Sequence, residues 1–191
     1  MAMLFRLRTL KGVFTDLVAL EELLLNDNLL LQLANDWFSN TPNLKTVHLE
    51  NNVIFEIQEG ALQPLKRLAH LFLSFNFISE VTASCFRYNM AMTSLDLDHN
   101  HISSVQSTAF RGVPKLRELR LQNNVIKSVK RELFVSLTSL TELHLQNNRI
   151  SRYNRLCTLY VRLYPKVAKL KDSFQPRSRV KLWLNTINAT F

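Results

Sequence analysis

The sequence has few of the residues that mark flexible chains, metal sites and disulfide frameworks. It contains only three glycines in 191 residues, which argues against a low-complexity chain. Its two cysteines, Cys85 and Cys157, form neither a metal-binding motif nor a dense disulfide pattern. No apolar run reaches the roughly 18 residues that a transmembrane helix needs. These features predict a globular chain, long enough to bury a substantial core.

A recognisable export signal and an even spread of positive charge are also missing. The start, MAMLFRLRTLKG, is a poor signal peptide, because basic residues interrupt its apolar stretch and no small-residue cleavage site follows. The chain is therefore either cytoplasmic or a fragment of an exported protein. Nine of the 24 Lys and Arg residues but one of the 15 acidic residues lie in 151–191, which leaves 15 basic and 14 acidic residues in 1–150. Nine scattered basic residues without aromatic platforms do not lead us to expect nucleic-acid binding.

What the sequence does contain is a repeat. Six segments match L-x-x-L-x-L-x-x-N-x-L, with conservative replacements, and they start every 24 residues, at Leu20, Leu44, Leu68, Met92, Leu116 and Leu140. The L-x-L core alternates with period two, which predicts a short strand whose leucines face inward and whose intervening residues face outward. Each segment, with the residues up to the next one, is numbered below as coils 1 to 6.

Two further columns of the repeat predict structural roles. The asparagine of each motif stands where the chain leaves the strand, and a side-chain amide there can satisfy backbone groups that no strand pairing reaches. We expect a buried asparagine ladder formed by Asn28, Asn52, Asn76, Asn100, Asn124 and Asn148. The second half of each coil predicts a buried aromatic spine, with Leu62 replacing phenylalanine once, formed by Phe14, Phe38, Phe86, Phe110 and Phe134. Cys85 precedes Phe86 and is expected to be a small buried thiol.

The repeat frame fails after Ile150. We predict a solenoid in residues 1–153, made of a partial first repeat and six full repeats, and a non-repeat basic tail in 154–191. The tail contains a short amphipathic pattern, a candidate strand in VKLWLNTI, and a candidate N-glycosylation site at Asn188. The terminal coils of a solenoid expose core, so we expect the tail either to cap this end or to stay disordered, and not to extend the repeat.

These motifs resemble the 24-residue "typical" class of leucine-rich repeats, as in Toll-like receptors, Slit-type guidance proteins and chondroadherin-like matrix proteins. The resemblance covers roughly residues 5–153. It implies an α/β fold, a curved solenoid with a parallel sheet on its concave face and loops and short helical turns on its convex face. It also implies a non-catalytic module that binds a protein ligand on the concave face of an extracellular or cell-surface protein. The cysteine-rich caps usual in extracellular relatives are missing from this sequence.

The sequence offers no motif for chemistry. It has no phosphate-cradling glycine motif, no metal-spaced Cys/His set and no nucleophile elbow. His48 and His144 share a column but lie four coils apart, roughly 19 Å at ~4.8 Å per strand, so they cannot share a metal ion. We expect no enzymatic activity, no cofactor and no metal, and we expect the concave histidines to be solvated.

The third coil is the exception among the concave positions. Its segment HLFLSFNFI places Phe72 and Phe75 at positions that point outward in the other coils, whereas Phe77 is expected to be half covered. Exposed aromatic residues ringed by polar ones mark interaction sites, so we predict that Phe72 and Phe75 anchor a ligand. The alternative is that the rings lean on one another and on the side chain of a neighbouring residue. The remaining residues expected on the binding face are His48, Glu50, Asn51, Asp96, Asp98, His99, Arg120 and His144.

The predicted rim is acidic on balance, which favours a ligand with basic and apolar groups. Asp96 and Arg120 lie on adjacent predicted strands and are expected to pair. The sequence thus predicts a leucine-rich-repeat module for protein interaction. Two alternatives remain open, an intracellular adaptor that uses the same face and a truncated splice product without a binding role of its own.

Overall fold

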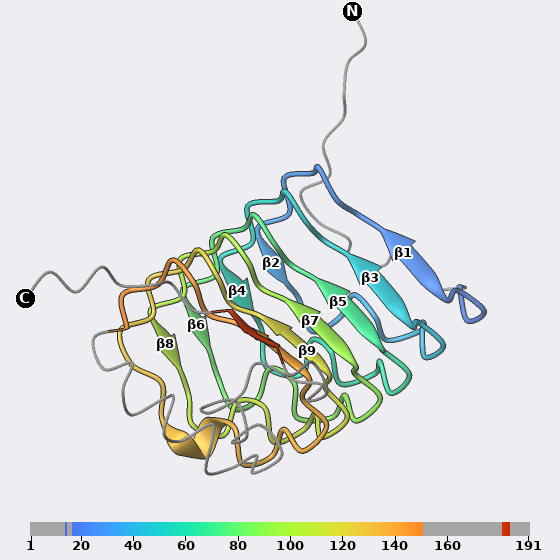
Figure 1. Cartoon of the computed structure of the whole chain (residues 1–191). Helices are drawn as coiled ribbons and strands as arrows, with labels where there is room; N and C mark the ends of the chain where they lie inside the picture. The colour runs from blue at the N-terminus through green and yellow to red at the C-terminus, as the bar shows by residue number, and fades with distance from the viewer. Residues whose placement is uncertain (1–13, 15–16, 151–180, 184–191) are drawn as a thin grey trace, which may run out of the picture.

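In the computed structural model of the chain, which describes residues 14, 17–150 and 181–183, the repeats form a curved stack of coils (Figure 1). Each L-x-L segment forms one strand of a seven-stranded parallel sheet with the order β1-β3-β5-β7-β9-β10-β11. These strands are β1 (Glu22–Leu24), β3 (Thr46–His48), β5 (His70–Phe72), β7 (Ser94–Asp96), β9 (Glu118–Arg120), β10 (Glu142–His144) and β11 (Lys181–Trp183). The predicted leucine-rich-repeat solenoid is confirmed.

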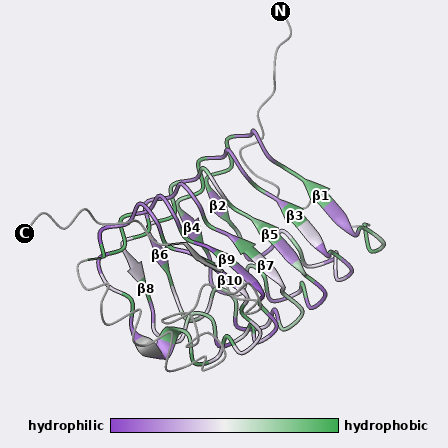
Figure 2. Cartoon of the chain, in the orientation of Figure 1, coloured by the Kyte–Doolittle hydropathy of each residue, from purple (hydrophilic) through white to green (hydrophobic). Residues whose placement is uncertain are grey.

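The register of the large sheet follows the period of the sequence. Leu23 pairs with Val47, Val47 with Leu71, and the same step of one repeat continues to Leu143. Equivalent residues therefore stack in columns. The middle residue of each strand from β1 to β10 in the large sheet is a buried apolar residue, and Figure 2 colours the chain by hydropathy.

The predicted aromatic spine is part of the core. Its five phenylalanines and Leu62 are all buried, and neighbouring rings stack in parallel, with centroids 6.5 Å apart for Phe14 and Phe38 and 6.1 Å apart for Phe86 and Phe110. Cys85 is a free, buried thiol beside the spine, as expected, and burial raises its pKa.

Five of the six motif asparagines bridge consecutive coils in the described part of the chain, and Asn28 of the first coil is half-buried and donates to the Leu25 carbonyl of its own coil at 3.1 Å. The Asn76 side chain accepts a hydrogen bond from the Ile54 N–H at 2.9 Å and donates to the carbonyl oxygens of Leu49 at 2.9 Å and Leu73 at 3.1 Å. Asn52, Asn100 and Asn124 repeat this pattern one coil away each time, and Asn148 repeats it less deeply buried. Each amide thus satisfies backbone groups of two coils that the strands leave without partners.

The convex side carries more strand and less helix than expected. Short strands form two separate two-stranded sheets, β2 (Gln32–Leu33) with β4 (Glu56–Ile57) and β6 (Glu80–Val81) with β8 (Ser104–Val105). Within the described residues the helical content is the single 3-10 turn η1 (Arg131–Leu133). No helix in that part of the chain has the length and apolar character needed to cross a membrane.

The strand expected in VKLWLNTI is present as β11, which pairs in parallel with β10 at the end of the large sheet. Leu182 takes the place beside Leu143 that a further repeat would supply. The rest of the tail, with the amphipathic pattern and Asn188, and most of the partial first repeat lie outside the described residues. The role of the tail as a cap therefore stays a prediction.

Candidate interaction face

The turn that follows each strand of the large sheet uses a left-handed backbone conformation. In coils 1 to 6 the residue before the motif asparagine has a φ between 47° and 59°. Five of the six are aspartate, asparagine or histidine, which tolerate this region, whereas the third coil has Phe75 with φ 55°. A bulky residue at positive φ is an outlier that the surrounding repeat imposes, and such outliers gather at functional sites.

Burial of the ring in the core does not compensate for the strained backbone conformation of Phe75. Its side chain is 50% exposed, and its ring stacks on His99 with centroids 4.2 Å apart. The ring therefore stands on the surface at the end of β5, where a partner can reach it. The predicted outward position of Phe75 agrees with this geometry.

Phe72 is less exposed than the sequence predicted. It is half-buried, because its ring lies against His48 with centroids 4.6 Å apart and faces His70 at 6.5 Å in a nearly parallel orientation. The alternative that the rings lean on their neighbours therefore holds in part for Phe72. Ser74, between the two phenylalanines, is buried.

Carboxylates flank these rings on the adjacent coils. Glu50, on coil 2, is the neighbour of Ser74 of coil 3. Its Oε1 is 3.0 Å from Nδ1 of His48, and its Oε2 is buried without a hydrogen-bond partner. Asp98 lies on coil 4, where its Oδ1 accepts hydrogen bonds from the His99 N–H at 2.7 Å and from Asn123 Nδ2 at 2.9 Å. We call Phe72, Phe75, Glu50 and Asp98 the Phe–acid patch.

Two residues next to the patch complete the predicted rim. Asn51 is exposed, and its N–H donates to the Ser74 carbonyl at 3.1 Å. Asp96 is buried, and its Oδ1 accepts a hydrogen bond from the Asp98 N–H at 2.9 Å. Burial raises the pKa of Asp96, although the Asp98 N–H and the positive charge of Arg120 offset part of the effect.

The expected ion pair between Asp96 and Arg120 does not form. Arg120 Nε instead lies 2.6 Å from Glu118 Oε1, because Glu118 is two residues away on the same strand and its side chain projects on the same side. Arg120 therefore belongs to a separate group with Glu118, Glu142 and His144 on coils 5 and 6. The side chain of Arg120 pairs with Glu118 and not with a residue of the Phe–acid patch, although its charge still acts on Asp98, and His144 lies on coil 6, away from the patch.

The concave histidines differ in their exposure. The His48 and His144 side chains are only 25% and 14% exposed, so the expectation that both are solvated is wrong, whereas His70 and His99 are exposed. Burial lowers the pKa of His144. One ligand atom each from Glu118, Glu142 and His144 lies within 4.8 Å of the others, which is close enough for a metal ion, but the Arg120 guanidinium already pairs with Glu118.

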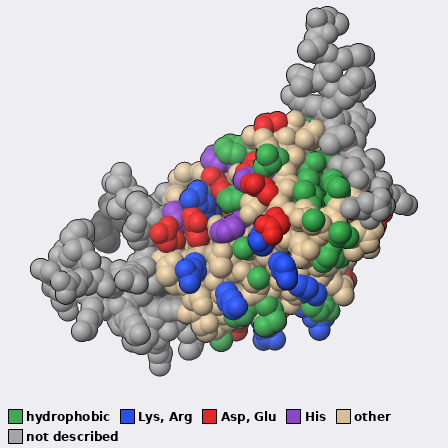
Figure 3. Space-filling view, turned by 90° about the vertical axis from the view of Figure 1, so that its right-hand side faces the viewer, with side chains coloured by type: hydrophobic (Ala, Val, Ile, Leu, Met, Phe, Trp, Pro, Cys, Tyr) green, Lys and Arg blue, Asp and Glu red, His purple; other side chains and the backbone are tan. Residues whose placement is uncertain are grey.

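A second apolar surface lies beyond the motif asparagines. Its Phe77 is half covered, as predicted, whereas the exposure of Leu31 and Phe55 was not predicted. Phe77 is 51% exposed and stacks on His101 at 5.2 Å, and Leu31 and Phe55, which share a column one coil apart, are each 50% exposed. Later coils carry Ser79, Ser103 and Lys127 in that column, which is a signal that the position faces solvent. Figure 3 shows apolar side chains gathered near the N-terminal coils, beside a mixed group of acidic, basic and histidine side chains.

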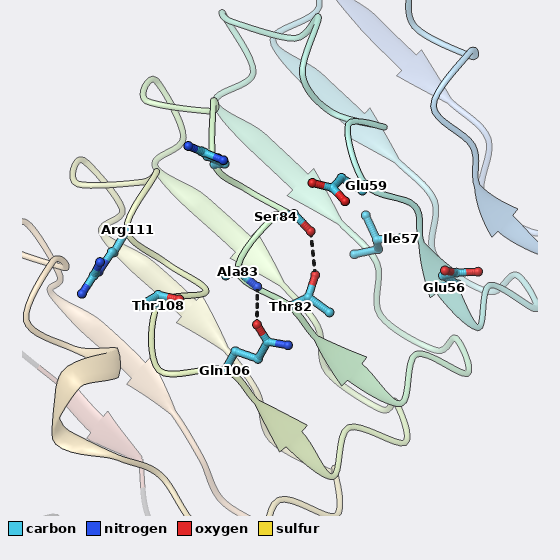
Figure 4. A pocket seen from close by; sticks show the side chains of 10 residues that line it. Glu56, Ile57, Glu59, Thr82, Ala83, Ser84, Gln106, Thr108 and Arg111 are labelled. Carbon is cyan, nitrogen blue, oxygen red and sulfur yellow. Dashed lines mark hydrogen bonds between the residues drawn. The ribbon is translucent and has the colours of Figure 1, made fainter.

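The convex side has a cavity of about 700 Å³ where its strand pairing is interrupted. Gln58 on coil 2 accepts a hydrogen bond from the Asn35 N–H at 3.2 Å, and Gln106 on coil 4 accepts one from the Ala83 N–H at 3.0 Å. Coil 3 has Thr82 in this column, whose hydroxyl lies 3.0 Å from Ser84 Oγ instead. The cavity lies beside this gap and includes Glu56, Ile57, Glu59, Thr82, Ala83, Ser84, Arg87, Gln106, Thr108 and Arg111 in its lining (Figure 4).

The fold and the repeat have counterparts among known proteins. The family profile described as "Leucine rich repeat" matches residues 18–78 and 91–150, which is more than half of the chain. Comparison with curated proteins found no match.

Two solved structures contain the same arrangement of coils. The crystal structure of a TLR13–ssRNA13 complex is 31% identical, with a TM-score of 0.70, over 76% of this chain and 21% of that chain. A Drosophila Toll–Spatzle complex, in a glycosylated form, is 24% identical with a TM-score of 0.64, over 68% of this chain and 19% of that chain, and shows the fold alone. This chain spans about a fifth of each of these chains.

Proposed function

Because the chain belongs to the leucine-rich repeat family, we propose that it is a non-catalytic protein-interaction module whose concave face binds a protein ligand at the Phe–acid patch. The observation that carries this proposal is Phe75, a bulky residue at φ 55° that is 50% exposed. If this position served only the stability of the fold, we would expect one of the polar residues that occupy the equivalent turn in the other coils. An exposed ring that the backbone holds under strain fits a contact with a partner.

The surroundings of Phe75 support the same function. Aromatic side chains contribute strongly at binding hot spots, and Phe72 adds a second, partly covered ring three residues before Phe75, at the end of β5. The large sheet fixes the Phe72 backbone, and the Phe75 N–H donates a hydrogen bond to the Asp98 carbonyl at 3.0 Å. A partner therefore meets a preformed surface, and little entropy is lost in ordering it. The roles of Asn51 and His99 are those of the polar rim around the anchors.

We place the protein, as part of this proposal, outside the cell or on its surface. The support is the 24-residue repeat, which resembles the class found in extracellular and cell-surface receptors, together with the 31% identity to TLR13. The test is expression in mammalian cells behind an added signal peptide. A glycosidase-sensitive mass shift that Asn188→Gln abolishes is the expected result, and secretion without a glycan would contradict the glycosylation site.

The binding proposal is tested by selecting a phage-displayed peptide library against the intact chain and measuring the affinity of the enriched peptides. Phe72→Ala/Phe75→Ala should abolish binding while the chain still melts cooperatively. Met90→Ala is the matched control, because Met90 is a 63% exposed apolar residue outside the concave face, and it should leave binding unchanged. Phe110→Ala, in the spine, should instead cost about 3–5 kcal/mol of stability. Peptides that bind the double variant as tightly as the parent would contradict the proposal.

A further inference from the structure

The acidic residues of coils 1 to 4 have no lysine or arginine on the concave side of their own coils. The positive charge of Arg120 on coil 5 acts on Asp96 and Asp98, but Arg120 forms its ion pair with Glu118. In coils 1 to 4, no outward-facing strand or turn position holds a lysine or an arginine. Five of these positions hold an acidic residue: Glu22, Asp27, Glu50, Asp96 and Asp98. The ion pairs recorded for this group in the described part of the chain involve only histidine, His48 with Glu22 and Glu50 and His99 with Asp98. This half of the face is therefore negatively charged when the histidines are neutral.

Two of the carboxylates are held where water solvates them poorly. Glu50 Oε2 is buried without a hydrogen-bond donor, and Asp96 is 9% exposed. A carboxylate in such a place gains more from a nearby cation than a fully solvated one does, because water screens the interaction less. The lysine closest in sequence, Lys45, pairs with Glu21 at 2.6 Å and lies before the strand.

The geometry of the patch combines this charge with apolar surface. Glu50 and Asp98 lie on the coils to either side of coil 3, so their backbones are two strand spacings, roughly 10 Å, apart. The small, buried Ser74 lies between them, and Phe72 and Phe75 flank Ser74 along the chain. A cationic side chain over Ser74 would meet a carboxylate on each side and aromatic rings along the strand, an arrangement that suits a guanidinium or an ammonium group.

We propose that the partner of the Phe–acid patch is a positively charged protein segment, which sets a lysine or arginine side chain between Glu50 and Asp98 and an adjacent apolar side chain against Phe72 and Phe75. This inference rests on the proposed function and specifies the chemistry of the ligand at the same site. It also separates this chain from the TLR13 complex, which was solved with ssRNA13, because the phosphates of an RNA would face carboxylates here.

The experiment uses the peptides selected against the intact chain. Enriched sequences should combine lysine or arginine with a neighbouring aromatic or aliphatic residue. Replacement of the cationic residue by a neutral isostere, citrulline for arginine or norleucine for lysine, should weaken binding about tenfold or more. Glu50→Gln/Asp98→Asn should cause the same loss, and the neutral peptide should bind this variant no more weakly than it binds the parent.

A charge-matched control separates the local effect from the overall charge. Glu56→Gln/Glu59→Gln removes two exposed carboxylates from the convex side and should change the affinity less than about twofold, because surface charges more than a Debye length away are screened at physiological salt. The Asn side chain at position 98 still offers an oxygen to the His99 N–H, and thermal melting checks that each variant is folded.

The outcomes distinguish this inference from the function on which it rests. If the peptides depend on Phe75 but keep their affinity when their cations are neutralised, the inference is wrong and the proposed function stands. If no selected peptide depends on Phe75, both are wrong. If a single-stranded RNA oligonucleotide displaces the peptides and its binding depends on Phe75, the partner class is wrong.

Discussion

The backbone strain at Phe75 can be separated from the contacts of its ring by comparing Phe75→Ala with Phe75→Asn. Both variants lose the stack on His99, worth about 0.5–1.5 kcal/mol, and the burial of about half a phenylalanine side chain, worth about 1 kcal/mol. Alanine keeps the left-handed strain of roughly 1–2 kcal/mol, whereas asparagine, the residue found in this column at Asn51, Asn123 and Asn147, relieves part of it.

Phe75→Asn should therefore be more stable than Phe75→Ala by about 0.5–1 kcal/mol and should lie within about 2 kcal/mol of the parent. The assay is urea unfolding followed by circular dichroism, with the free energies compared at equal slopes. Both variants should lose peptide binding to the same extent. If alanine is as stable as asparagine, Phe75 carries no strain, and if either variant loses the 3–5 kcal/mol expected of a core phenylalanine, the ring is structural.

Three further variants test the structure around this face. Asn100→Ala removes the acceptor of the Ile78 N–H and the donor to the Leu73 carbonyl, and should lower the unfolding free energy by about 1–3 kcal/mol in urea titrations. This loss should exceed that of Asn148→Ala, at the less buried end of the ladder. Equal melting of Asn100→Ala and the parent would refute the structural role. Asp96→Asn keeps an oxygen for the Asp98 N–H but removes a carboxyl whose pKa is raised in the folded chain, so the native state takes up the proton before the unfolded state does. The variant should be more stable than the parent at pH 7, and this advantage should shrink as the pH falls through the raised pKa towards 3.8; an advantage that is constant with pH would refute the argument. Thr82→Gln gives coil 3 the side chain with which Gln58 and Gln106 accept a hydrogen bond from a backbone N–H of the preceding coil. The new side chain should accept a hydrogen bond from the Glu59 N–H and stabilise the chain by about 0.5–1.5 kcal/mol. A melting temperature no higher than that of the parent would show that the gap needs more than one side chain to close.

The repeat phase was enough to predict the fold because the leucines of one coil are buried only against the same positions of the next. Once Leu23 and Val47 share a column, the parallel pairing, the buried spine and the outward position of Phe75 follow from the period alone. The pattern could not reveal the gap on the convex side, since that gap depends on Thr82 standing where Gln58 and Gln106 stand in other coils.

Side-chain contacts across columns were also beyond the sequence pattern. The exposed fraction of Phe72 depends on the packing of the His48 and His70 rings against its own ring. The ion pair of Arg120 depends on Glu118 being closer to it than Asp96 is. Leu31 and Phe55 lie three residues after a motif asparagine, beyond the positions that the pattern assigns to the concave face, so the pattern did not predict their exposure. The period of the backbone determines whether a side chain points inward or outward. How far that side chain is buried, and with which residue it forms an ion pair, depend on the residue types in the neighbouring columns.

The central claim, that the concave side of coil 3 receives the partner, is tested most directly by photo-crosslinking. A selected peptide carries a diazirine in place of its apolar residue, is irradiated on the intact chain, and its attachment points are found by mass spectrometry. Crosslinks should fall within residues 48–51, 70–75 and 94–99, and an excess of unlabelled peptide should remove them. Crosslinks concentrated on 82–87 and 106–111 around the convex cavity, or on Leu31 and Phe55, would contradict the claim.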